Sequence, residues 1–479
     1  MSMKKISIYI FPIILFFFTG CEPDVIAPPN QGLAFIKYFG HVLDQQASDI
    51  KRTPDLGYIL VGSTNAYSTS SDIFIVKTDQ EGNELWSVAL GENPPSGTDY
   101  GEDGIGVVVL ADGSYVIAGN KKYINTSGAN PVIERTKIVM YKLAIDGSIE
   151  VGPITLRESD TNHSDEVADM EWDRYQTANV VVLTGNTTNV TVGKPGGPFP
   201  ATDFKDIFTA RVDVDNNFDI PWNTSLAYGF DGEDYGVSVQ VLTTGYVVVG
   251  HDQQAIYKDN GEYRDNIRLV QYDRVSGGIN NTIDEGNKTN KYVGGYSTID
   301  TVNNRITVFS TSLAPTSPNI SLQFGGEAVI MQTDFDLVVR TFPRPVSLSN
   351  ALPLTNTGKQ QVYSRGIDFV DDDDGFVLSM TVAALNSDNS VAASDMAVTK
   401  LDNNLNQEAG WPFYAGFQSS DNGGSTFQDA ASIIVVQDTV AGSNKKVLSG
   451  YAMTGTFDLE SNTMLGLVKL NTTGTLEPK

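Results

Sequence analysis

Residues 72–86 read DIFIVKTDQEGNELW, and this stretch contains the pattern that decides the fold. An apolar run ends at Lys77, Asp79 follows two residues later, a glycine stands at position 82, and Trp86 opens the next apolar run. Asp favours a tight turn because its side chain bonds the local backbone. The stretch therefore predicts two strands joined by a short turn.

The same pattern occurs seven times, at intervals of 60 to 69 residues. The strand ends carry Lys77, Lys142, Arg211, Gln271, Gln332, Lys400 and Lys469. Two residues later stand Asp79, Ala144, Asp213, Asp273, Asp334, Asp402 and Asn471. Recurrence at a fixed period is the signature of a repeat architecture.

Each repeat contains four Val/Ile/Leu-rich runs, which we name strands a to d in chain order. In the first full repeat, strand b is GYILVGST from Gly57 and strand d is WSVALG from Trp86. Seven four-stranded units predict an all-β protein, a seven-bladed β-propeller. The last unit has no strand d, whereas an unassigned strand, AFIKYFG from Ala34, precedes the first unit. We predict that it completes the last blade and closes the ring, so that residues 33–479 form one propeller domain.

The repeat pattern is GY-hydrophobics-G-S/T, then hydrophobics-K-x-D-x-x-G-x-x-W. It resembles the β-propeller repeats that are common in secreted and lipid-anchored bacterial proteins. The resemblance implies the fold and no particular activity, because such repeats occur in scaffolds, binding proteins and enzymes.

The first twenty residues predict a signal peptide. Lys4 and Lys5 precede an apolar run, Ile6 to Phe18, which is too short for a membrane span, and small residues follow it. The segment from Phe18 to Cys21 resembles a bacterial lipoprotein signal, with Cys21 as the lipidated first residue of the mature chain. A chance cysteine in an ordinary secreted protein is the alternative.

Residues 21–32 follow as a Pro-rich tether. Glu22 and Asp24, directly after the cysteine, resemble the acidic export signal of surface lipoproteins in Bacteroidota. We therefore expect a protein that is lipid-anchored at the outer membrane and exposed at the cell surface.

Composition excludes several classes of function. Thirty-two Lys and Arg against 58 Asp and Glu give a net charge of −26, which excludes a nucleic-acid binder because phosphate binding needs clustered basic residues. One Cys excludes a disulfide framework. The sequence contains no nucleophile elbow and no phosphate-binding loop. We therefore lean towards a protein that is not an enzyme and has no cofactor.

The long connections of the repeat fall on one face of the predicted propeller. Strand b to c connections are long, whereas a–b and c–d turns are short. The long ones are Asn120–Arg135, Asn186–Lys205, His251–Asp265, Thr311–Gly326 and Ala383–Ser394. Their aromatic residues and those of the first repeat are candidates for binding a ligand or partner: Tyr67, Tyr123, Phe199, Phe204, Tyr257, Tyr263 and Phe324. Loop drift and aromatics that pack the loops onto the blades are the alternatives.

Acidic residues recur where strand a begins. These are Asp44, Asp103, Asp165, Asp234 and Asp429, with Arg365 and Val293 in the two units that depart from the pattern. We expect them to ring the mouth of the central channel. They serve either as repeated turn caps or as a cation site, for which Ca²⁺ is the candidate because its ligands are oxygens.

Three functions stay open from the sequence. The first is a non-catalytic binding or scaffold protein that holds an extracellular glycan, a peptide or a partner in an outer-membrane uptake or secretion complex. The second is an extracellular polysaccharide-active enzyme with carboxylates at the central channel. The third is a purely structural envelope protein.

Overall fold

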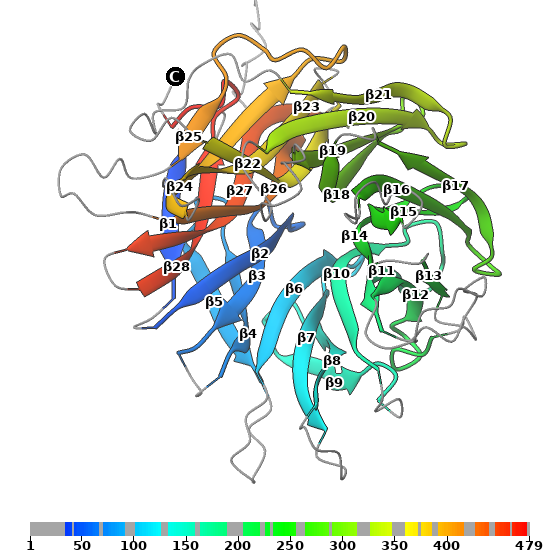
Figure 1. Ribbon diagram of the computed structural model, residues 1–479. Helices are drawn as coiled ribbons and strands as arrows, with labels where there is room; N and C mark the ends of the chain where they lie inside the picture. Colours follow the sequence, from blue (N-terminus) through cyan, green and yellow to red (C-terminus); the bar gives the residue numbers. More distant parts are fainter. Residues whose placement is uncertain are drawn as a thin grey trace, which may run out of the picture.

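The computed structural model describes residues 34–40, 43–66, 70–91, 101–125, 133–158, 163–188, 205–220, 226–229, 233–254, 264–286, 290–313, 326–346, 360–371, 375–385, 391–415, 427–439, 446–459 and 462–476. Across these ranges every regular element is a strand, and the sheets stand in a ring (Figure 1). In the described part of the chain, no helix has the length and apolar character to span a bilayer.

The first four blades follow one another along the chain. Blade 1 contains β2 (Gln45–Arg52), β3 (Tyr58–Thr64), β4 (Asp72–Thr78) and β5 (Glu84–Leu90). Blade 2 contains β6 (Glu102–Val109), β7 (Tyr115–Asn125), β8 (Ile133–Leu143) and β9 (Ile149–Thr155). Blade 3 contains β10 (Asp165–Trp172), β11 (Val180–Thr187), β12 (Asp206–Asp213) and β13 (Leu226–Tyr228). Blade 4 contains β14 (Asp234–Val241), β15 (Gly245–Gln254), β16 (Arg264–Asp273) and β17 (Ile279–Glu285).

Three further blades complete the ring. Blade 5 contains β18 (Lys291–Asp300), β19 (Arg305–Leu313), β20 (Glu327–Asp334) and β21 (Val339–Pro345). Blade 6 contains β22 (Gln360–Val370), β23 (Gly375–Leu385), β24 (Val391–Leu401) and β25 (Phe413–Ala415). Blade 7 contains β26 (Gln428–Thr439), β27 (Lys446–Leu459), β28 (Asn462–Leu470) and β1 (Phe35–Phe39). The predicted seven-bladed propeller is confirmed.

Ring closure occurs through the first strand, as the sequence predicts. β1 pairs antiparallel with β28, from Phe35 opposite Lys469 to Phe39 opposite Leu465. Phe39 is buried in a cluster that joins Leu465 of blade 7 to Ile50 of blade 1. The N-terminal strand therefore occupies what would otherwise be an open sheet edge.

The hydrophobic core lies between neighbouring blades. One cluster joins Ile138 of blade 2 to Phe208 of blade 3, and another joins Phe309 of blade 5 to Phe376 of blade 6. Each blade is apolar on both faces because it packs against a blade on either side. This explains why strand b reads as a continuous apolar run and not as an alternating one.

The repeated Asp or Asn holds the c–d turn, as predicted. Asp79 accepts the backbone N–H groups of Glu81 (3.0 Å) and Asn83 (2.8 Å). Asn471 does the same for Thr473 and Thr475 in blade 7. The side chains thus fix the turn locally.

The glycine and the aromatic residue of the motif meet across blades. Gly147 has a φ of +84°, and a Cβ there would lie 2.9 Å from the ring of Trp86 in blade 1. Gly474 of blade 7 stands in the same relation to Trp411 of blade 6, with a φ of +73°. The turn therefore needs glycine for its backbone conformation and for the close approach of the ring.

Replacing Trp411 tests this contact between blades. Trp411 is buried and meets Tyr451 edge to face. We expect Trp411→Ala to lower the free energy of unfolding by about 3–5 kcal/mol, because a buried aromatic side chain is lost. Val302→Ala, at a side chain that is 70% exposed, is the matched control and should leave stability nearly unchanged. Equal effects in a urea titration would contradict the packing role of Trp411.

Three of the five long b–c connections, those of blades 2, 4 and 6, are shorter than the sequence predicts, whereas in blades 3 and 5 the strands end close to the predicted bounds. In blade 2, pairing continues from Lys121 opposite Lys137 to Asn125 opposite Ile133, so most of the expected loop Asn120–Arg135 is strand. The hairpins of blades 4 and 6 likewise extend into the ranges His251–Asp265 and Ala383–Ser394. In blades 2 and 4 these segments are polar and pair through their backbones, which side-chain composition does not indicate.

Candidate functional site

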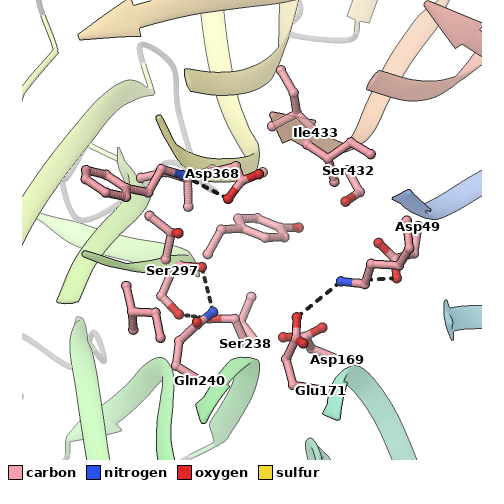
Figure 2. Close-up of a pocket in the computed structure, with 18 of the residues that line it drawn as sticks. Asp49, Asp169, Glu171, Ser238, Gln240, Ser297, Asp368, Ser432 and Ile433 are labelled. Atoms are coloured by element: carbon pink, nitrogen blue, oxygen red, sulfur yellow. Dashed lines mark hydrogen bonds and ion pairs between the residues drawn. The ribbon is translucent and has the colours of Figure 1, made fainter. Parts of the chain in front are cut away.

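The innermost strands enclose a polar cavity of about 430 Å³ at the centre of the ring (Figure 2). Strand a of every blade contributes to its lining. We call this cavity the central channel. Its charged residues in Figure 2 come from blades 1, 3 and 6.

Three carboxylates of the channel bridge neighbouring blades, and we call them the bridging carboxylates. Asp49 accepts the backbone N–H of Val107 in blade 2 (3.2 Å). Asp169 accepts that of Val239 in blade 4 (2.8 Å). Asp368 of blade 6 accepts the backbone N–H of Val435 in blade 7 (2.7 Å).

The second oxygen of each bridging carboxylate is also occupied. It accepts the N–H of the residue that follows the aspartate, at 2.8 Å in all three cases. Asp49 and Asp169 both stand directly after a β-bulge in strand a. A bulge redirects a side chain, and these two turn towards the adjacent blade.

Lys51 links two sides of the channel. Its Nζ lies 3.2 Å from Glu171 of blade 3 and 3.8 Å from Asp49 of its own strand. Burial would lower the pKa of Lys51, but the carboxylates of Asp49, Glu171 and Asp169 outweigh it and raise the pKa. Lys51 is therefore a permanent cation among these acids.

Two bridging carboxylates have raised pKa values. Burial, with the nearby charge of Glu171, raises the pKa of Asp169 to about 8. Burial also raises the pKa of Asp368 to about 6. These values place proton exchange near neutral pH.

Neutral side chains make the corresponding link between blades 4 and 5. The Ser238 hydroxyl bonds Gly295 O and Ser297 Oγ, both at 2.7 Å. The Gln240 amide donates to Ser297 O at 2.8 Å. The polar lining thus serves contacts between blades on both sides of the channel.

The acidic residues expected at the channel mouth do not form one ring. Asp165 is buried and accepts bonds from Lys137 (3.2 Å), Arg157 (2.9 Å) and Thr187 (2.7 Å). Asp234 is buried as well. Both side chains therefore lie within the protein, while Asp44 and Asp429 are exposed.

The register explains this division. Lys121 and Thr187 occupy the same position of strand b, two residues after its glycine. Glu102 pairs with Lys121, and Asp165 pairs with Thr187. Asp165 therefore corresponds to Glu102 and not to Asp103. Because side chains alternate along a strand, an offset of one residue changes the face.

The other residues of the expected acidic column do not contact one another as a group. Asp429 forms an ion pair with Arg365 (3.0 Å), one of the two departures from the column, whereas Val293 pairs with Thr311 in blade 5. Asp44 and Asp103 share the border of a hollow of about 410 Å³. In the described ranges, no three His, Cys, Asp or Glu side chains are grouped so that they could hold a metal ion.

The binding candidates of the loops lie outside the described residues. These are Tyr67, Phe199, Phe204, Tyr257, Tyr263 and Phe324, together with the lipidation candidate Cys21. Tyr123 belongs to β7, but its side chain is outside the described part.

Sequence reasoning missed the bridging carboxylates. They occur in the segments SDIKR, ADMEW and IDFV, within strand a. An aspartate in the interior of a strand, where such residues are depleted, is the signal that could have indicated them.

No family model matches this chain, and no curated protein matches it. Among solved structures, the Dos1 propeller is similar over 88% of this chain and 77% of its own, with 11% identity and a TM-score of 0.37. An α-L-arabinanase from Penicillium chrysogenum is similar over 92% of this chain and 100% of its own, with 9% identity and a TM-score of 0.38. The Synechocystis apocarotenoid oxygenase is similar over 91% of this chain and 94% of its own, with 9% identity and a TM-score of 0.42. The seven-bladed fold rests on the strand pairing of this chain and not on these distant likenesses.

Proposed function

We propose that this chain is a non-catalytic binding or scaffold propeller, held at the outer membrane through Cys21. The observation that supports the proposal is the engagement of both oxygens of Asp49, Asp169 and Asp368 by backbone N–H groups. A carboxylate that catalyses proton transfer must reach its substrate, whereas these three connect blades. The channel therefore serves as the hub of a rigid platform.

The ligand or partner of this platform binds at the face of the b–c connections. The candidate residues there are aromatic, and aromatic side chains suit glycan, peptide and protein surfaces. An outer-membrane uptake or secretion complex is the kind of assembly that a lipid-anchored platform would join.

Lipid anchoring can be measured directly. When cells are grown with radiolabelled palmitate, the wild-type protein should incorporate the label, whereas Cys21→Ala should not because it has no site for the acyl chains. Ser7→Ala, within the signal peptide, is the control and should incorporate the label like the wild type. Incorporation of the label into Cys21→Ala would contradict the anchor.

Binding at the loop face needs a separate test. Wild type and a variant with residues 190–203 replaced by a Gly/Ser linker are purified from their own membranes, and bound proteins are identified by mass spectrometry. The proposal expects a stoichiometric partner, or a ligand on a glycan array, that the variant loses. If both proteins retain the same partner, this loop is not the binding site.

An extracellular polysaccharide-active enzyme is the second candidate. The specific observation in its favour is the pair of raised pKa values, about 8 for Asp169 and about 6 for Asp368, in one cavity. General acids need such values near neutral pH. The purely structural role is the third candidate. The stability of channel variants separates the binding or scaffold protein from the enzyme.

A further inference from the structure

A groove lies between blades 1 and 2, on the face that carries the short a–b and c–d turns, opposite the b–c connections. We call it the lower groove. Its volume is about 520 Å³. The apolar part consists of Leu85 and Trp86 of β5 and Ile145 of the c–d turn in blade 2. Asp112, Asp146 and Glu150 add carboxylates to the lining.

The apolar part of the lower groove is open to solvent. Leu85 is 56% exposed and Ile145 is 57% exposed. The Trp86 indole N–H donates to Ile145 O at 3.1 Å, which fixes the aromatic ring beside the turn. Two exposed aliphatic side chains next to a held indole form a preorganised apolar contact surface.

The charge of the lower groove is negative. The lining contains four carboxylates, those of Asp55, Asp112, Asp146 and Glu150. Lys77 pairs with Asp55 (2.8 Å) and Lys142 pairs with Glu150 (2.9 Å), so Asp112 and Asp146 carry the net negative charge. Hydrogen bonds from Ser114 hold the pKa of Asp112 below its usual value, and those from Ser148 do the same for the pKa of Asp146. The lining therefore stays anionic at neutral and mildly acidic pH.

The groove coincides with a break in the repeat. Ala144 is the one position of the Asp/Asn column that carries neither residue. The turn is held instead by Asp146, which accepts the N–H of Ser148 at 3.0 Å. Because Ala144 stands where the other units have Asp or Asn, a methyl group lines the groove, and the carboxylate that holds the turn comes from Asp146, two residues later.

We propose that the lower groove binds a short basic segment of a partner protein. The segment presents a large apolar side chain to Leu85, Trp86 and Ile145, and flanking Lys or Arg residues pair with the carboxylates. Apolar contact at the centre with opposite charges around it is the arrangement of a peptide-docking site. The inference goes beyond the proposed function, because it needs no binding at the loop face.

The test uses a fluorescein-labelled hexapeptide, Lys-Arg-Leu-Trp-Lys-Arg, and the full chain in detergent solution, with the peptide in detergent alone as the blank. Fluorescence anisotropy should show saturable binding. A peptide with Ser-Gly in place of Leu-Trp, and one with Glu in place of each basic residue, should each bind at least about tenfold more weakly.

Two double variants separate the apolar and the charged parts. Leu85→Ser with Ile145→Ser should weaken binding about tenfold at every salt concentration. Asp112→Asn with Asp146→Asn keeps the oxygens that hold the turns, and should weaken binding at low salt but not at 0.5 M NaCl, because salt screens exposed charges. Asp336→Asn with Val338→Ser, the same kinds of change in the exposed turn of blade 5, is the matched control and should bind like the wild type.

Absence of saturable binding, or equal binding by wild type and both groove variants, would overturn the docking site. Neither result would contradict the proposed scaffold function, because that function is tested by binding at the face of the b–c connections. Weakening by the groove variants alone supports the inference.

Discussion

Deleting residues 34–40 is expected to produce the largest loss of stability in this protein. The deletion removes β1, whose five residues pair with β28, and exposes the outer edge of blade 7. It also removes Phe39, which is 5% exposed, and Phe35, which covers Gly82 of blade 1. Losing one buried aromatic side chain already costs about 3–5 kcal/mol, so we expect a loss of at least about 5 kcal/mol for the whole strand.

The measurement is a thermal melt of the full chain with and without these residues. For a chain of this length, 1 kcal/mol corresponds to about 1 °C, so the melting temperature should fall by about 5 °C or more. Deleting residues 25–31, seven residues of the tether, is the matched control and should not change it. An unchanged melt for the deletion of residues 34–40 would contradict closure of the ring by β1.

Removal of a bridging carboxylate is the second large effect. Asp368→Ala leaves the N–H groups of Phe369 and Val435 without their acceptor. Each unsatisfied buried donor costs roughly 1–3 kcal/mol, so we expect a loss of roughly 2–6 kcal/mol in a urea titration. Asp368→Asn keeps one acceptor oxygen and should lose about half as much. If the alanine variant were as stable as the wild type, these bonds would not hold blades 6 and 7 together.

The pH dependence of Asp169 has a defined sign. Its pKa of about 8 in the folded protein lies above the ordinary value of 3.8, so the folded state keeps a proton that the unfolded chain releases. The stability that this group contributes is complete below pH 4 and is lost as the pH rises towards 8. The destabilisation by Asp169→Asn should therefore be greatest near pH 4 and decrease towards pH 8.

The fold could be predicted from the sequence because its determinants are local and repeated. The Asp79 turn and the run that ends at Lys77 occur in every unit, with small changes, and period alone gives the blade count. The role of β1 followed from counting strands. Boundaries were less accurate, since the hairpin from Tyr115 to Leu143 continues through polar residues.

The site could not be predicted in the same way. Which face an aspartate occupies depends on the bulge before it, as at Asp49 and Asp169, and a bulge has no clear sequence pattern. The expected acidic column combines two neighbouring positions of strand a, as at Asp103 and Asp165, and only the strand register separates them. The lower groove was overlooked because short turns indicate scaffold, whereas the exposure of Leu85 and Ile145 becomes visible only when two blades are placed side by side.

The stability of three isosteric variants, Asp49→Asn, Asp169→Asn and Asp368→Asn, tests the central claim most directly. Melting temperatures are measured at pH 5 in the same buffer, beside the wild type. If the channel is a structural hub, all three variants melt below the wild type. Residues kept for catalysis commonly cost stability, and their replacement stabilises the protein. Variants that melt at or above the wild-type temperature would contradict the hub and favour an enzyme with its carboxylates in the central channel.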